Sequence, residues 1–187
     1  MNRQTFQLSI LLSIGLFIFV APGKAQEIRT QSLSLSIGAS AGYAPVLTFG
    51  NIEDSGAILG FSGDLQYQNI VGQFDFVYVL PETVSSESLT SGMGFFGSLG
   101  YKIIANENLH IPVMLTGGAS IIRYSVFNEF YDVSPQFGLT LSPYYMLNEK
   151  MSVFGAFRYM KGFKGSAQSD PIDLASVSIG LRFMLFK

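Results

Sequence analysis

After residue 31, the chain alternates almost everywhere between apolar and polar residues with a period of two. Residues 32–43 have the sequence SLSLSIGASAGY, in which the odd positions are apolar and the even positions are Ser or Gly. Successive side chains of a β-strand point to opposite faces of the sheet, so this pattern places all the apolar residues on one face. In a helix the same residues would be spread around the whole circumference. The alternation therefore predicts strands with one apolar and one polar face.

Eight segments carry this alternation, and each is about as long as the 9–11 residues that a tilted membrane-spanning strand needs. In the third segment, Val77 and Val79 fall on the otherwise polar face. Eight is the smallest usual number of strands in an outer-membrane barrel. The segments are residues 32–43, 57–68, 71–80, 92–104, 109–121, 133–145, 151–160 and 175–186.

The connections between these segments alternate between short and long. Short turns are expected near 69–70, 105–108 and 147–150, where Asn residues favour turns. Longer stretches lie at 44–56, 81–91, 122–132 and 161–174. This order predicts an all-β, eight-stranded, up-and-down antiparallel barrel with both termini at the short-turn end. In an outer membrane that end is periplasmic, and the long loops are extracellular.

Residues 1–25 have the features of a cleaved signal peptide. Arg3 precedes the largely apolar stretch from Leu8 to Val20, and small residues at Gly23 and Ala25 allow a cut before Gln26. An uncleaved transmembrane anchor is the alternative, but the apolar stretch is shorter than the roughly 20 residues of a spanning helix. The predicted domains are therefore a signal peptide, residues 1–25, and an outer-membrane β-barrel, residues 26–187.

The composition excludes several classes of protein. Apolar residues make up 48% of the chain and charged residues 13%, and a disordered chain would have the opposite balance. A net charge of −2 without a basic cluster argues against nucleic acid as a partner. The chain has no cysteine and one histidine, so disulfides and Cys- or His-based metal sites are not expected. No cofactor is expected either.

The polar face of the predicted strands is mostly Ser, Gly, Thr and Gln. A soluble barrel of the lipocalin kind would turn its apolar face inward and carry many charges outside. Here the polar face has few ionisable residues, which suits a narrow lumen in a membrane barrel. The expected lumen charges are Asp64, Asp75, Lys102, His110, Arg158 and Arg182.

Tyrosines on the apolar face lie near the strand ends. Amphipathic rings at both interfaces form the aromatic girdles of membrane barrels. The topology places three of them at the outer rim, Tyr43, Tyr78 and Tyr159, and three at the inner rim, Tyr67, Tyr101 and Tyr145.

The last predicted strand ends with Ser178, Gly180, Phe183 and Leu185 at polar, Gly, aromatic and hydrophobic positions. This pattern resembles the C-terminal β-signal read by the assembly machinery of Gram-negative outer membranes, although Lys187 follows the usual terminal Phe. With the signal peptide and eight strands, residues 26–187 resemble the small OmpA/OmpX-type outer-membrane β-barrel families. These families include anchors, adhesins, small channels, secretion accessories and a few lipid-modifying enzymes, so the resemblance does not choose a function.

Asp64 and Asp75 flank the first tight turn and would face each other if Asn69 and Ile70 were its central residues. Two such carboxylates could form an acid pair, but pairing with a lumen Arg or Lys is favoured because buried charges are normally paired. His110 is predicted near the periplasmic end, whereas the barrel enzymes of similar size have catalytic groups near the extracellular side. No enzymatic activity is therefore expected.

The four long stretches sum to a charge of −5. Glu53 with Asp54, or Asp170 with Asp173, could hold a hard cation such as calcium, but isolated acidic loops are more often simply solvated. The stretch 122–132 carries four aromatic residues, which either form a contact surface or fold over the barrel mouth. These residues are Tyr124, Phe127, Phe130 and Tyr131.

The sequence favours a non-enzymatic outer-membrane protein with a structural or interaction role through its extracellular loops. Outer-membrane lipid, lipopolysaccharide and another envelope or surface protein are the expected partners. A small pore is an alternative, because the Gly- and Ser-rich inner face leaves room in the lumen. A secreted lipocalin-like binder of apolar ligands is the third hypothesis.

Overall fold

The computed structural model describes residues 33–49, 52–81, 89–126, 128–165 and 170–186. The predicted signal peptide, residues 1–25, lies outside this part of the chain. Within it, no helix is long and apolar enough to cross a membrane.

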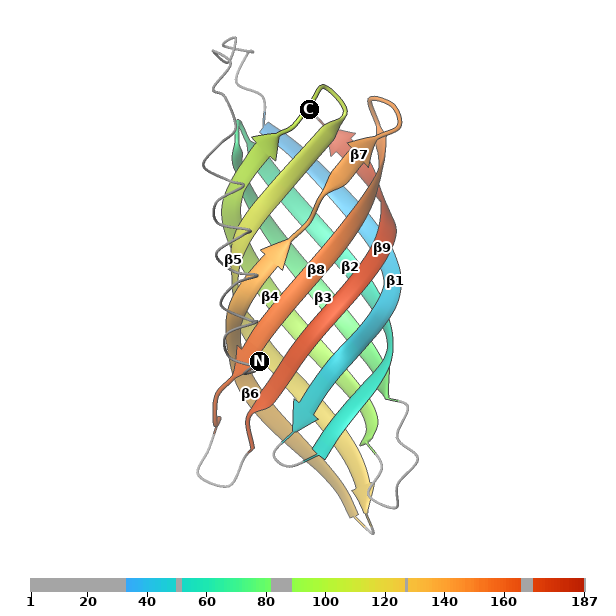
Figure 1. The fold of residues 1–187 in the computed structure, drawn as a ribbon, viewed down its shortest axis with the longest axis vertical. Coiled ribbons are helices and arrows are strands. Elements are labelled where there is room, and N and C mark those ends of the chain that lie inside the picture. The colour runs from blue at the N-terminus through green and yellow to red at the C-terminus, as the bar shows by residue number, and fades with distance from the viewer. Residues whose placement is uncertain (1–32, 50–51, 82–88, 127, 166–169, 187) are drawn as a thin grey trace, which may run out of the picture. The chain divides into compact units, whose positions relative to one another are not determined.

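The described residues form one closed antiparallel sheet (Figure 1). Its strands are β1 Leu33–Phe49, β2 Ile52–Tyr67, β3 Ile70–Pro81, β4 Leu89–Ile104, β5 Leu109–Val126, β6 Asn128–Leu141, β7 Tyr144–Met146, β8 Met151–Gly162 and β9 Ile172–Phe186. The strands pair in chain order around the wall, and β1 also pairs with β9, which closes the barrel. Strands β6 and β7 both lie between β5 and β8. They form one strand of the wall, so the predicted eight-stranded up-and-down barrel is confirmed.

Pro143 lies at the break between β6 and β7. Proline has no N–H to donate to the sheet, so it interrupts a strand. The neighbouring backbone still bonds to both flanking strands, because Ser142 N donates to Pro112 O at 3.0 Å and Gly155 N donates to Pro143 O at 2.8 Å. The wall therefore stays closed across the interruption.

Two of the three predicted short turns are built around an Asn side chain. Asn106 Oδ1 accepts hydrogen bonds from the backbone N of Asn108 at 3.0 Å and of Leu109 at 2.8 Å. Asn148 Oδ1 does the same for Lys150 and Met151, both at 2.9 Å. These bonds satisfy backbone groups that the sheet leaves unpaired. We call this end of the barrel the short-turn end and the opposite end the long-loop end.

The first turn differs by one residue from the prediction. Tyr67 pairs with Ile70, so Gln68 and Asn69 are its central residues rather than Asn69 and Ile70. Gln68 has a φ of 55°, the left-handed conformation that two-residue hairpin loops require. The shift places Asp64 opposite Gln73 instead of Asp75.

The strands reach further at the long-loop end than predicted. Strands β1 and β2 stay paired up to Phe49 and Ile52, and β5 and β6 stay paired up to Val126 and Asn128. The stretches 44–56 and 122–132, predicted as long loops, are therefore mainly continuations of the sheet. The alternation missed these extensions because inward residues such as Leu47 and Ile122 are apolar, so the two faces differ less in polarity there.

The two faces of the wall have the predicted polarity in the part of the barrel nearer the short-turn end. Apolar side chains such as Phe61, Leu99 and Ile179 point outward and are 63%, 65% and 66% exposed. Ser, Thr and Gln side chains on the other face are buried in the lumen. A lipocalin-like binder would have the opposite arrangement.

Glycines allow the strands to coil tightly around this narrow lumen. A Cβ on Gly118 would lie 2.0 Å from Phe95 O and 2.8 Å from Phe96 Cδ1. A Cβ on its neighbour Gly117 would have its nearest contact, Phe137 Cδ2, at 3.8 Å. Only the first of these two positions therefore requires glycine.

We expect Gly118→Ala to lower the free energy of unfolding by about 1–3 kcal/mol, because overpacking forces the backbone of the neighbouring strand to move. Gly117→Ala is the matched control and should leave the stability almost unchanged. Urea unfolding of the refolded protein in detergent, followed by gel mobility without heating, measures both. Equal stability of the two variants would contradict the close packing at Gly118.

Candidate functional site

The inward side chains of the barrel bring two ion pairs together across the lumen. Arg158 Nη2 lies 2.7 Å from Asp75 Oδ2, and Arg182 Nε lies 2.8 Å from Asp64 Oδ2. The four side chains are at most 7% exposed. The structure therefore gives each carboxylate its own arginine, and the acid pair considered from the sequence is not formed.

The Asp75–Arg158 pair is held by further contacts from several strands. Gln73 Nε2 donates to Asp75 Oδ1 at 2.7 Å, and Arg158 Nε donates to Thr140 Oγ1 at 3.3 Å. The Arg158 guanidinium lies 5.1 Å from the centre of the Phe96 ring, within the range of a cation–π interaction. A chain of hydroxyls, Ser98, Thr116 and Thr140, continues around the lumen with both O–O distances at 2.8 Å.

The Asp64–Arg182 pair has fewer hydrogen bonds. Ser36 Oγ donates to Asp64 Oδ2 at 3.4 Å, and Arg182 Nη2 donates to Ser142 Oγ at 3.5 Å. The guanidinium instead lies 4.7 Å from the centre of the Phe154 ring. Among the described protein groups, Asp64 Oδ1 and Arg182 Nη1 have no hydrogen-bond partner. Charge and ring contacts therefore hold this pair.

Lys102 and His110, also expected in the charge network, lie toward the short-turn end. Their cluster reaches the Asp64–Arg182 pair through Tyr144, whose ring centre is 5.1 Å from the Arg182 guanidinium. Lys102 Nζ donates to Gln66 Oε1 at 3.1 Å, and the Tyr144 hydroxyl donates to the same oxygen at 3.1 Å. His110 Nδ1 lies 2.9 Å from the Tyr144 hydroxyl. A tyrosine has one hydroxyl proton, so Nδ1 of His110 is the donor in this contact. These contacts join Lys102 and His110 to an amide and a phenol.

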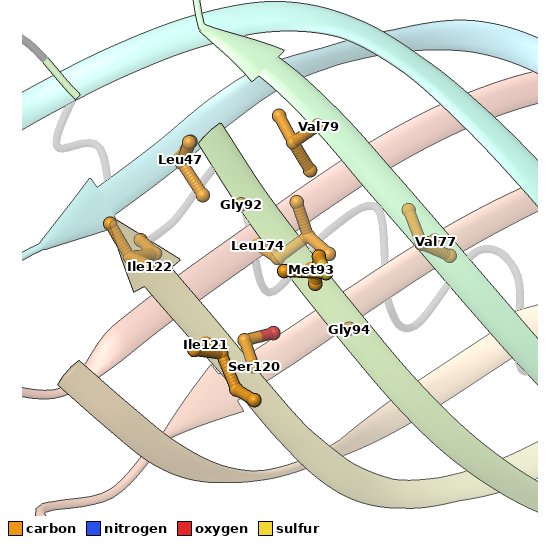
Figure 2. Close-up of a pocket in the computed structure, with 10 residues that line it drawn as sticks. All are labelled: Leu47, Val77, Val79, Gly92, Met93, Gly94, Ser120, Ile121, Ile122 and Leu174. Atoms are coloured by element: carbon orange, nitrogen blue, oxygen red, sulfur yellow. The ribbon is translucent and has the colours of Figure 1, made fainter. Parts of the chain in front are cut away.

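The lumen near the long-loop end is apolar, a feature that the sequence reasoning missed. Val77 and Val79, which interrupted the polar alternation of their strand, point into it together with Ile122 and Leu174 (Figure 2). A cavity of about 10 Å³ remains between these side chains, too small for a ligand. The buried cluster consists of Ala44, Leu47, Ile58, Val77, Val79, Phe96, Ile122, Met160, Ile172 and Leu174. The two valines were the signal that could have revealed it.

The other residues predicted from the sequence lie on the barrel wall or outside the described part of the chain. Tyr78 is half-buried, and the remaining five tyrosines of the expected girdle, Tyr43, Tyr67, Tyr101, Tyr145 and Tyr159, point outward and are 42–58% exposed. In β9, Ser178 and Gly180 occupy inward positions, while Phe183 and Leu185 are exposed on the outer face. Phe127 and the side chains of Tyr124, Phe130 and Tyr131 are outside the described residues.

Acidic residues do not converge on a metal site in the described part of the chain. No group of three or more His, Cys, Asp or Glu residues there could hold a metal ion. Asp173 contacts Lys161 Nζ through Oδ2, and its Oδ1 accepts from Gly162 N at 2.9 Å. This acidic residue is therefore used to tie β9 to β8.

Known proteins match this chain by structure. No protein-family model matches the sequence, and no curated protein matches it. Neisserial surface protein A matches with a TM-score of 0.71 and 12% identity, covering 82% of this chain and 99% of that chain. A major outer membrane protein from Thermus thermophilus matches with a TM-score of 0.55 and 10% identity, covering 82% and 100%. Ail, the attachment invasion locus protein of Yersinia pestis solved with the heparin analogue sucrose octasulfate, matches with a TM-score of 0.53 and 11% identity, covering 84% and 100%.

At these identities the likeness concerns the fold. The chain has the fold of the small eight-stranded outer-membrane β-barrels, in agreement with the OmpA/OmpX-type resemblance of its sequence.

We expect Asp75→Asn alone to lower the free energy of unfolding by about 3–5 kcal/mol, because it leaves the buried Arg158 charge unpaired. The double variant Asp75→Leu/Arg158→Met removes both charges and should be more stable than the single variant. Lys161→Met breaks the exposed contact with Asp173 and should cost less than about 1 kcal/mol. Urea unfolding in detergent compares the three; a double variant that is less stable than Asp75→Asn would contradict a buried ion pair.

Proposed function

We propose that this chain is an integral outer-membrane β-barrel without enzymatic activity, with a structural or interaction role carried by its long-loop end. The observation that carries the proposal is the outward apolar wall between two levels of tyrosines, combined with a lumen filled by paired charges. A wall of this polarity requires hydrocarbon around it, because water would leave a large apolar area exposed.

The height of the apolar wall supports a membrane location. Along β1, ten residues separate Leu33, which lies opposite Tyr67, from Tyr43. At about 3.3 Å per residue and a tilt of about 40°, this stretch rises about 25 Å along the barrel axis. The apolar band of an outer-membrane barrel is about 25 Å tall. The six tyrosines then act as girdles at the two interfaces.

The orientation of the barrel in the membrane is inferred from the usual arrangement of outer-membrane barrels. Both termini and the short turns would face the periplasm after removal of residues 1–25, and the long-loop end would face outward. The assembly machinery would recognise the end of β9 through Ser178, Gly180, Phe183 and Leu185.

The paired hairpins β1–β2 and β5–β6 would present the extracellular contact surface. Lipopolysaccharide and another envelope or surface protein are the partners that this position favours. The long stretches at this end carry a charge of −5, so divalent cations could bridge them to lipopolysaccharide phosphates. The same charge disfavours a sulfated polyanion such as the ligand in the Ail complex.

A pore is less well supported than an interaction role. An eight-stranded barrel is just wide enough for its own side chains. Here arginines, Phe96 and Phe154 occupy the space that the inward Gly and Ser residues leave. These side chains narrow the lumen, which favours the interaction role over a small channel.

Adjacent positions of β4 test the membrane location, because the chain has no native cysteine. In bilayers, a fluorophore on the thiol of Leu99→Cys should be strongly quenched by lipids brominated near the middle of their chains. The thiol of Ser98→Cys, which faces the lumen, should stay unreactive until the barrel is unfolded. Equal reactivity at both positions, or no quenching at Leu99→Cys, would contradict a lipid-facing wall.

A further inference from the structure

Four inward side chains lie at one level near the long-loop end, and we call them the apolar collar: Leu47, Val79, Ile122 and Leu174. Leu47 is the register partner of Leu174. Val79 pairs with Gly92, which pairs in turn with Ile122. All four are at most 4% exposed, and Figure 2 shows them around one cavity. The collar thus closes the lumen from β1, β3, β5 and β9.

A bulge in β1 brings Leu47 into the collar. The register of β1 against β2 shifts between Ala44 and Leu47, and against β9 it shifts between Tyr43 and Val46. Without a shift, Leu47 would share the outward parity of Tyr43. A bulge adds one residue and changes the face that the following side chains occupy.

At the height of the apolar collar, the outer face of the barrel gains charged side chains. Between the two tyrosine levels, none of the described outward side chains is charged. Level with the collar, Glu53 and Lys161 are exposed on the outside. Apart from Asp54, the inward register partner of Leu47, the described interior at this height is apolar, and an apolar interior with charges outside is the arrangement of a protein section that stands in water. The collar therefore lies in the part of the barrel beyond the hydrocarbon layer.

We propose that the apolar collar is a second closure of the lumen that works independently of the two ion pairs below it. This inference deepens the proposed function and rests on it, since it explains how the outer mouth stays closed. Ion pairs can be hydrated and separated, whereas a narrow apolar constriction excludes water and ions by dewetting. The residual cavity of about 10 Å³ is at the lower limit for a single water, which also needs polar partners.

Ser120 provides a reporter position just below the collar. It lies two residues from Ile122 on the inward face of β5 and lines the same cavity. A small charged thiol reagent must pass the collar to reach the thiol of Ser120→Cys from the long-loop end. From the short-turn end it must pass both ion pairs.

The experiment compares three forms of the folded protein in detergent, each carrying Ser120→Cys: the parent, a collar variant with Val79→Thr and Ile122→Thr, and an ion-pair variant with Asp75→Asn and Arg158→Gln. Threonine keeps the branched shape of valine and adds a hydroxyl that water can bind. We expect the collar variant to react about tenfold faster or more than the parent, because protection follows the cost of opening the barrier. The ion-pair variant should react as slowly as the parent.

Fast reaction of the parent, or acceleration by the ion-pair variant and not by the collar variant, would overturn the proposal. Gel mobility without heating selects the folded fraction of each form. If the threonine variant does not fold, Val79→Ala/Leu174→Ala makes the same comparison by widening the collar. The experiment needs no bilayer, so its failure is separate from a failure of the lipid quenching at Leu99→Cys.

Discussion

The closing ladder between β1 and β9 is the contact on which the rest of this structure depends. Once it forms, the sheet of described strands has no free edge, and each of these strands has a neighbour on both sides. In hydrocarbon, backbone groups without such partners would each cost several kcal/mol. Closure with only eight strands also makes the lumen narrow, so the inward side chains must fill it completely. The polar faces that the alternation creates are thereby forced into contact with one another.

That forced contact explains the composition of the lumen. Charged groups buried at this depth must be paired, and each aspartate has its own arginine. The guanidinium groups lie against Phe96 and Phe154, which have room because facing positions such as Gly118 and Gly180 lack side chains. The lumen has polar pairs toward the short-turn end and apolar packing toward the long-loop end. This divides the barrel into a section suited to lipid and a section suited to water. Tyr43, Tyr78 and Tyr159, the tyrosines nearer the long-loop end, lie near this division.

Much of the fold could be predicted from the sequence because polarity alternates along each strand and Asn residues mark two of the turns. The same alternation also predicted which residues face the lumen. Their partners could not be predicted, since pairing depends on register, and a one-residue change in the first turn moves Asp64 from Asp75 to Gln73. The strand ends at the long-loop end were missed because an apolar lumen removes the contrast in polarity between the two faces. In addition, the bulge before Leu47 reverses which positions of β1 face the lumen. Val77 and Val79 indicated the apolar lumen at this end, but in the sequence they are only exceptions to the polar alternation of their strand.

The proposed membrane barrel requires a wall that is apolar toward lipid and a lumen that is closed to water. NMR of the uniformly labelled protein in lipid nanodiscs, with a lipid-soluble and then a water-soluble paramagnetic agent, tests both statements together. We expect the lipid-soluble agent to broaden side-chain signals of outward residues such as Phe61 and Ile179, while Thr116 and Thr140 in the lumen are protected from both agents. Broadening of the lumen threonines by the water-soluble agent, or of the outward residues by that agent alone, would contradict it.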